Sequence, residues 1–167
     1  MSAPAVVIRK ATEADVPGIV DLWKEFMDFH AVRDPYFTRS ASGHENFAKY
    51  VAERMRKESD IVLVAEAAGC LVGFCVAGIV QRPPVYEISE CGGIDSLAVT
   101  EGYRRRGVGN RLVEEARRWF IGRGVRRIEV GVLMENRTAG SFWRKMGFRP
   151  YFEKMYLDLD APVSDRS

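Results

Sequence analysis

Residues 97–112 have the sequence LAVTEGYRRRGVGNRL. The stretch predicts a strand that ends at Val99, a loop with three consecutive arginines, and a helix that begins at Gly107 and Gly109. Backbone N–H groups at the start of a helix point outward, and the helix dipole favours negative charge there. Glycine lets that backbone approach an anion without an intervening Cβ. The spacing therefore predicts an anion-binding loop, with a solvated basic turn as the equal alternative on spacing alone.

The charge distribution agrees with a small anionic ligand. The chain carries 25 basic and 23 acidic residues, a net charge of +2. Nine arginines and three glutamates lie between Glu101 and Arg127, which gives this stretch a charge of +6 and the remainder −4. A basic centre on a mildly acidic body suits a compact anion better than a nucleic-acid track. We therefore expect no nucleic-acid partner.

Length and composition indicate an ordinary globular protein. The chain has 167 residues, of which 47% are hydrophobic and 29% charged. This composition excludes a collagen, a disordered tail and a disulfide mini-protein. We expect one domain over residues 1–160, followed by a flexible C-terminal tail at residues 161–167.

The cysteines and histidines argue against disulfides and a metal site. Cys70, Cys75 and Cys91 are odd in number and form no CxxC pair, so we expect free thiols and a cytoplasmic location. His30 and His44 are the only histidines, and without a Cys/His cluster we expect no metal. The N-terminus lacks a signal-peptide pattern, and no apolar run approaches ~20 residues, so we expect no membrane association.

Hydrophobic periodicity predicts the element order β-α-α-β-β-β-α-β-α-β. The first helix begins after Thr12, a residue type that caps helix starts, with Asp15 three positions later. The pattern favours an α+β or mixed α/β sheet with helices on both faces. The expected strands are 5–9, 61–65, 71–80, 93–99, 127–133 and 152–159, and the later helices lie around 47–55, 108–120 and 136–146.

Two blocks resemble the GNAT superfamily of acetyl-CoA-dependent N-acetyltransferases. The first is Arg104-x-x-Gly107-x-Gly109 after a strand, which looks like that superfamily's pyrophosphate loop. The second spans residues 136–148, N-x-x-A-x-x-F-W-x-K-x-G-F, and is similar to its downstream helix. With the element order, the resemblance covers nearly the whole chain. It implies a central, mostly antiparallel sheet of six to seven strands, splayed at an acetyl-CoA slot, with four helices on both faces.

The resemblance also implies how acetyl-CoA would be held. Backbone amides of residues 105–110 would bind the pyrophosphate, and the main chain of Leu97 and Val99 would pair with the pantetheine arm. The N–H of Leu97 would polarise the thioester carbonyl. For Phe142, plain core packing is an equal alternative. The implied contacts are Leu97, Ala98, Val99, Arg104, Arg105, Arg106, Gly107, Val108, Gly109, Asn110, Asn136, Phe142 and Lys145.

The implied reaction is direct attack of an amine on the acetyl thioester, without a covalent enzyme intermediate. A mostly protonated amine needs a base, for which we favour Asp95; a strand-edge role without chemistry is the alternative. Trp143 stands where the family usually has a tyrosine as proton donor, and an indole N–H is not an acid at biological pH. Tyr151, Tyr156 or water could replace it, although each tyrosine could instead be structural.

The acceptor side should lie on the first helix and the loop after it. The candidate substrate contacts are Phe26, His30, Asp34, Tyr36 and Asp95; anchoring the loop to the core is the alternative role for its aromatic residues. The leading function is acetylation of a small-molecule primary amine. A non-catalytic acetyl-CoA sensor and a protein or peptide N-acetyltransferase are the alternatives. By analogy with the family we expect a homodimer, through the last strand or the loop at 81–89.

Overall fold

A five-stranded sheet organises residues 4–160, the part of the chain that the computed structural model describes. The strands follow one another in the order of the sequence, and β1 to β4 are antiparallel neighbours. The last strand, β5, runs parallel to β4. The predicted α+β class is thereby confirmed. The strands are β1 (Val6–Lys10), β2 (Asp60–Ala67), β3 (Cys70–Gln81), β4 (Glu90–Val99) and β5 (Ile128–Val130).

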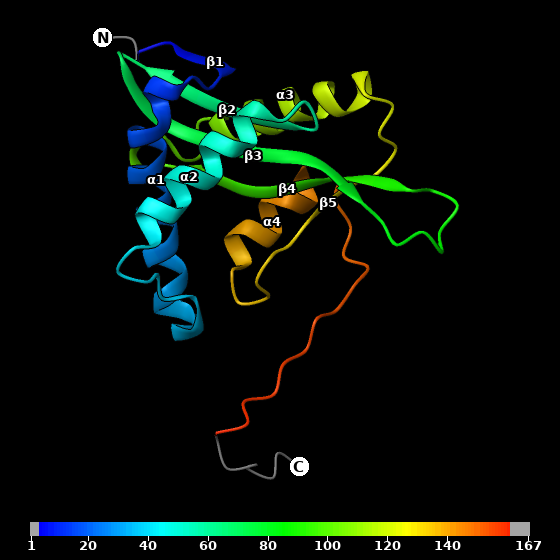
Figure 1. The fold of residues 1–167 in the computed structure, drawn as a ribbon. Helices are drawn as coiled ribbons and strands as arrows, with labels where there is room; N and C mark the ends of the chain where they lie inside the picture. Colours follow the sequence, from blue (N-terminus) through cyan, green and yellow to red (C-terminus); the bar gives the residue numbers. More distant parts are fainter. Residues whose placement is uncertain (1–3, 161–167) are drawn as a thin grey trace.

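Four α-helices cover the two faces of the sheet (Figure 1). Helices α1 (Val16–Arg33) and α2 (Gly43–Arg56) lie on one face. Helices α3 (Val108–Gly122) and α4 (Arg137–Lys145) lie on the other. Short 3-10 turns occur at η1 (Glu13–Asp15), η2 (Pro35–Phe37) and η3 (Glu101–Tyr103). Within residues 4–160, no helix is both long and apolar enough to cross a membrane.

Alternation along the two central strands divides the core into two layers. Val62 and Val64 of β2 face α1 and α2, whereas Leu63 and Ala65 face α3 and α4. Such alternation follows from the two-residue period of a strand, and both sets are apolar because both faces are covered. The fully buried Phe74 of β3 belongs to the first layer, and Phe120 of α3 belongs to the second.

The sheet has fewer strands than the sequence predicted. Residues 152–159 were expected to form a last strand, but residues 148–158 have no regular secondary structure here. Figure 1 shows this segment running away from the sheet. Alternating apolar residues favour a strand only where a neighbouring strand edge accepts it, and sequence pattern cannot supply that neighbour. Residues 161–167, the predicted flexible tail, lie outside the described residues.

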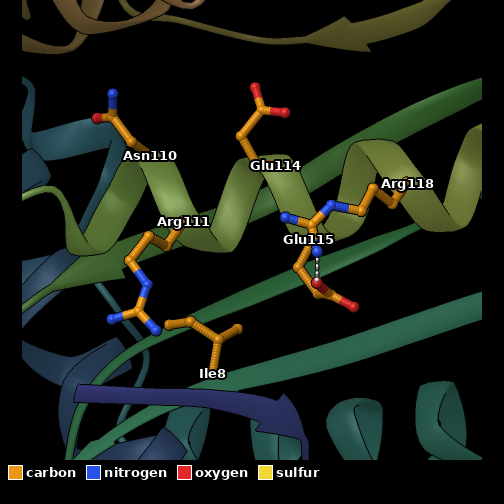
Figure 2. A pocket seen from close by; sticks show the side chains of 6 residues that line it. All are labelled: Ile8, Asn110, Arg111, Glu114, Glu115 and Arg118. Carbon is orange, nitrogen blue, oxygen red and sulfur yellow. Dashed lines mark hydrogen bonds and ion pairs between the residues drawn. The ribbon is translucent and has the colours of Figure 1, made fainter. Parts of the chain in front are cut away.

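A hollow of about 310 Å³ lies between β1 and the outer side of α3 (Figure 2). Its two arginines already donate hydrogen bonds to neighbouring groups of the protein. Arg111 donates to the carbonyl of Val6 over 2.8 Å, and Arg118 donates to Glu115 over 2.8 Å. Two arginines and two glutamates therefore largely balance one another around it, which makes it a poor site for a charged ligand.

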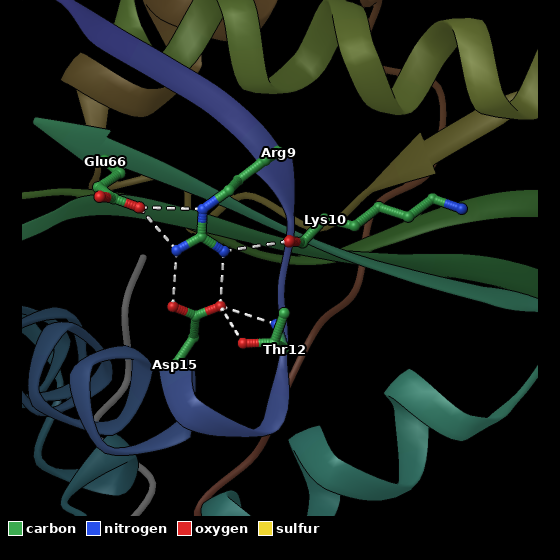
Figure 3. A network of polar contacts seen from close by, with 5 residues as sticks. All are labelled: Arg9, Lys10, Thr12, Asp15 and Glu66. Atoms are coloured by element: carbon green, nitrogen blue, oxygen red, sulfur yellow. Dashed lines mark hydrogen bonds and ion pairs between the residues drawn. The ribbon is translucent and has the colours of Figure 1, made fainter. Parts of the chain in front are cut away.

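Arg9 fixes the start of α1 to the edge of the sheet (Figure 3). Its guanidinium donates to both oxygens of Asp15, over 2.7 and 2.9 Å, and to Glu66 of β2. Asp15 also accepts from the backbone N–H of Thr12, which is the N-cap of η1, whereas Asp15 itself is the N-cap of α1. Hydrogen bonding by Arg9 lowers the pKa of Asp15 to about 2. Because Asp15 is buried, this pair should contribute measurably to stability.

Replacing Asp15 with Asn tests that contribution. The pKa of the carboxyl is about 2 in the fold against 3.8 ordinarily, so its stabilising effect is complete above about pH 4 and disappears as the pH falls through the folded value. We expect Asp15→Asn to lower the free energy of unfolding by about 2 kcal/mol at neutral pH and far less in strong acid, measured by urea denaturation. Asp21→Asn on α1 is the control. An equal loss under both conditions would contradict this account.

Candidate active site

The sheet opens between β4 and β5. These strands pair only where residues 92–94 of β4 lie beside 128–130 of β5. Beyond Ile94, β4 continues to Val99, and in the described part of the chain β3 is then its only partner. One edge of β4 is therefore open from Asp95 onward. This confirms the splayed sheet that the family resemblance implied.

The backbone groups of Leu97 and Val99 face this opening. On the other side of β4, the N–H of Thr100 donates to the carbonyl of Val72 over 2.9 Å. Alternate residues of a strand turn their peptide groups to opposite sides. Leu97 and Val99 therefore present N–H and C=O groups away from β3, as required for pairing with an extended ligand.

A cradle of backbone N–H groups follows directly after this edge. The backbone is left-handed at Arg105 (φ 59°) and at Gly107 (φ 77°), immediately before α3 begins at Val108. Successive N–H groups in such a turn form an anion-binding concavity. Within residues 4–160, the backbone N–H groups of residues 105–110 have no protein acceptor. The predicted loop thus has the geometry of an anion site.

Helix α4 packs beside this cradle. A Cβ on Gly109 would lie 3.3 Å from the ring of Phe142, so glycine allows α4 to approach the first turn of α3. Asn136 caps α4 by accepting from the N–H of Ala139 over 3.1 Å. Its side-chain carbonyl is thus used for the helix, and its NH₂ group can still donate a hydrogen bond. Lys145 is the last residue of the helix.

Trp143 belongs to the core rather than to the opening. Its side chain packs against Phe142 and Phe148, with both ring-centroid distances at 5.0 Å, and the residue is buried. The indole contributes to the layer between the sheet and helices α3 and α4. Where the family usually has a tyrosine, this chain therefore has a tryptophan that packs in the core.

Arg104 connects the loop to the end of α1. Its Nε donates to the carbonyl of Val99 over 2.8 Å, and its guanidinium lies 6.0 Å from the ring of Phe29. The Val99 carbonyl, one of the groups expected to pair with pantetheine, thus already accepts a hydrogen bond. A ligand on this edge has to share that oxygen with Arg104 or displace the side chain.

Asp95 is the extra residue of a β-bulge. Val76 of β3 pairs with Ser96, and the next residue, Ala77, pairs with Ile94. Asp95 therefore has no partner in the ladder, and a bulge of this kind re-aims a side chain. The carboxylate meets α2, where its Oδ2 accepts from the hydroxyl of Tyr50 over 3.0 Å and pairs with Arg54.

Arg54 holds two carboxylates together. It also pairs with Asp60, Nε to Oδ2, over 2.5 Å, and the two side chains are largely covered, with 13 and 7% of their surface exposed. Gly78 of β3 leaves room for the pair, because a Cβ there would lie 2.1 Å from Asp60 Oδ1. Burial, and then the charge of Asp95, raise the pKa of Tyr50 to about 12. Tyr50 therefore stays protonated and donates to Asp95.

Sequence analysis missed Tyr50, Arg54 and Asp60 as functional candidates. The predicted helix around residues 47–55 contains Tyr50 and Arg54, but its pattern assigns them no function. The available signal was the Tyr50–Arg54 spacing of i, i+4, which puts both side chains on one helix face. This spacing does not indicate which strand the two side chains contact.

The predicted acceptor residues gather at the end of α1. The rings of Phe26 and His30 lie 4.2 Å apart, and His30 Nδ1 contacts the carbonyl of Phe26 over 2.7 Å. Asp34 accepts from the N–H of Tyr36 over 3.0 Å and so caps η2. Tyr36 itself is 86% exposed. Through Arg104 and Phe29, this end of α1 lies next to the anion cradle.

The two tyrosines proposed as proton donors lie on the segment after α4. Tyr151 donates to Glu129 of β5 over 2.8 Å, and this hydrogen bond raises its pKa. Tyr156 is 83% exposed on the segment after α4. Asp95, by contrast, contacts α2. Their role as acids stays a prediction.

An open strand edge that runs into an anion cradle defines a site for an extended, phosphate-bearing ligand. The sequence matches the model of the acetyltransferase (GNAT) family over residues 20–148. The chain belongs to this family. An uncharacterized N-acetyltransferase of Methanocaldococcus jannaschii is 28% identical over 144 residues, 84% of this chain. The chain spans 59% of the length of that relative.

Solved structures share the fold. The BH1408 protein from Bacillus halodurans, as a tetramutant, has a TM-score of 0.80 at 24% identity, covering 92% of this chain and 99% of that one. Aminoglycoside N-acetyltransferase AAC(6')-Iy, solved in complex with CoA, has a TM-score of 0.75 at 18% identity, with coverage of 96% and 98%. At these identities the likeness concerns the fold alone.

Proposed function

We propose that this chain transfers the acetyl group of acetyl-CoA to a primary amine of a small molecule, by direct attack and without a covalent enzyme intermediate. The observation that carries the proposal is the open edge of β4, which leads straight into the N–H cradle at residues 105–110. An extended arm that ends in a pyrophosphate matches this succession of groups. The family membership and the aminoglycoside acetyltransferase with the same fold support an amine acceptor.

The residues around the opening fit acetyl-CoA. Bound there, acetyl-CoA supplies an activated acetyl thioester. In the proposal, the amides of 105–110 bind the pyrophosphate, the arginines at 104–106 add positive charge, and Asn136, Phe142 and Lys145 line the side formed by α4. The N–H of Leu97 donates to the thioester carbonyl and stabilises the negative charge that develops on its oxygen.

Asn110→Asp tests the cradle without weakening the helix. A carboxylate in the first turn of α3 favours the helix dipole but repels a pyrophosphate. We expect the dissociation constant for CoA, measured by calorimetry, to rise at least about tenfold, equivalent to about 1.4 kcal/mol, while the melting temperature stays level or increases. Asn110→Ser is the control, and pantetheine, which has no pyrophosphate, should bind both variants alike. Equal CoA affinity in the two variants would count against the cradle.

Asp95 is proposed as the base. Tyr50 and Arg54 both contact the Oδ2 atom of its carboxylate. We assign the other oxygen, Oδ1, to the substrate ammonium, whose proton it takes directly or through one water. The residue is accessible, with 40% of its side chain exposed. Phe26, His30, Asp34 and Tyr36 are the proposed acceptor contacts, and Tyr151 or Tyr156 the proposed proton donors.

Asp95→Asn should be most damaging where the amine is protonated. An amide cannot accept the proton, so we expect kcat/KM to fall about 100-fold near neutral pH. The loss should shrink well above about pH 9, because more of the amine is then free of its proton. Steady-state rates over this range, with Asp21→Asn as control, measure the difference. A loss that does not depend on pH would exclude Asp95 as the base.

The activity itself is tested by CoA release from acetyl-CoA with polyamines, amino acids, aminoglycosides and short peptides. We expect turnover with one class of small amine, and mass spectrometry should show one added acetyl group on it. Turnover with peptides alone would favour a peptide acetyltransferase. Binding of acetyl-CoA without turnover of any amine would favour the non-catalytic sensor.

A cytoplasmic location and a homodimer complete the proposal. Cys75 and Cys91 are buried free cysteines, and burial raises the pKa of Cys75 to about 12. Thiols in that state fit a reducing compartment.

A further inference from the structure

Strands β3 and β4 carry a pair of glycines close to Asp95. Gly78 and Gly93 are partners in the β3–β4 ladder, so two adjacent positions on one face of the sheet have no side chain. Neither residue has the positive φ that would itself require glycine. Glycine inside a strand also occurs where another group approaches the backbone closely. The space above these two residues is therefore the reason to look for here.

Neighbouring side chains fill that space from two sides. Above the first glycine lie Arg54 and Asp60, the pair that anchors the carboxylate of Asp95. Above the second glycine, a Cβ on Gly93 would lie 3.0 Å from Val80 Cγ2 and 3.7 Å from Asp95 Oδ1. The valine methyl group and the carboxylate oxygen thus approach the same point of the sheet, and they leave little room between them.

Oδ1 is the oxygen of Asp95 that remains for an acceptor. The other oxygen, Oδ2, accepts from the Tyr50 hydroxyl and pairs with Arg54. Within residues 4–160, Oδ1 accepts no hydrogen bond, although 40% of the Asp95 side chain is exposed. An ammonium group that donates to Oδ1 has to come within about 2.6–3.2 Å of it. On the side of Gly93, the carbon that bears the nitrogen then lies beside Val80.

Val80 gives this place an apolar wall. Its surface is 47% exposed, so its methyl groups are accessible from solvent. An exposed valine alone needs no explanation. Next to the free oxygen of Asp95, however, it offers a hydrocarbon chain a contact that removes apolar surface from water. A carboxylate oxygen beside an apolar wall suits an ammonium group carried on a CH₂ carbon.

We propose that Val80 and Gly93 select the acceptor, so that the site takes primary amines on an unbranched CH₂ carbon and excludes amines on a branched carbon. This inference rests on the proposed function, in which Asp95 is the base, and it narrows the substrate class. The ammonium donates to Oδ1 of Asp95, and the CH₂ carbon packs against Val80. A second substituent on that carbon meets the valine methyl group. The α-amino groups of amino acids and peptides, glycine apart, carry such a substituent.

The isomers n-butylamine and sec-butylamine test the proposal, because they differ in branching but have the same composition and nearly equal basicity. With acetyl-CoA and the wild-type chain, we expect kcat/KM to be at least about tenfold higher for n-butylamine, a discrimination that one methyl group can produce. Val80→Ala removes the wall and should bring the two values within about threefold of each other. The matched control is Val7→Ala, at an exposed valine on β1, which should keep the wild-type ratio.

Gly93→Ala changes the same place in the opposite direction. The added methyl group fills the space between Val80 and Asp95, so kcat/KM for n-butylamine should fall at least about tenfold, chiefly through a higher KM. Gly122→Ala is its control, because a Cβ at that position meets nothing within 4 Å. The dissociation constant for CoA should be equal in all these variants, which shows that they are folded.

A binding measurement separates this inference from the reaction itself. In NMR spectra of the ¹⁵N-labelled chain saturated with CoA, n-butylamine should shift the amides of Val80 and Gly93 saturably, and sec-butylamine should bind at least about tenfold more weakly. Equal rates or affinities for the two isomers, a preference that Val80→Ala leaves intact, or no saturable shift at Gly93 would each overturn the selection. Binding with this preference but without turnover of any amine would overturn the acetyl transfer and support the selection.

Discussion

The separation of β4 from β5 after Ile94 is the constraint on which the candidate site depends. Buried backbone N–H and C=O groups have to find partners, and a strand edge left open inside a fold is tolerated where water or a ligand supplies them. Here the open edge carries Leu97 and Val99 and ends at the cradle before α3.

A second departure, the bulge at Asp95, connects helix α2 to that slot. Without the bulge, Asp95 would pair with a residue of β3 like its neighbours Ile94 and Ser96. With it, Asp95 reaches Tyr50 and Arg54 of α2, and through Arg54 it is tied to Asp60 at the start of β2. The site thus combines backbone N–H and C=O groups of β4 and of the start of α3 with polar and charged side chains of α2.

The sequence predicted the fold and the cradle well because their constraints are local. A left-handed turn before a helix depends on a few neighbouring residues such as Gly107, and so does the cap formed by Asn136. The surroundings of Asp95 were not predictable in this way, because Tyr50 and Arg54 lie more than 40 residues away and meet it only through the bulge. From the sequence, Trp143 appeared only as the replacement of the family's usual acid. The orientation of its indole side chain depends on packing against Phe148, which a sequence pattern does not give. The alternation at Met155 predicted a strand, but a strand also needs a partner edge.

The most direct test of this account is an NMR titration of the ¹⁵N-labelled chain with CoA. The largest amide shift changes should occur at Leu97, Val99 and residues 105–110, because these N–H groups face the proposed ligand. The amides of β1, on the far edge of the sheet, should change little. Changes confined to the hollow between β1 and α3, or no saturable change at all, would contradict the claim that the parting of β4 and β5 builds the CoA site.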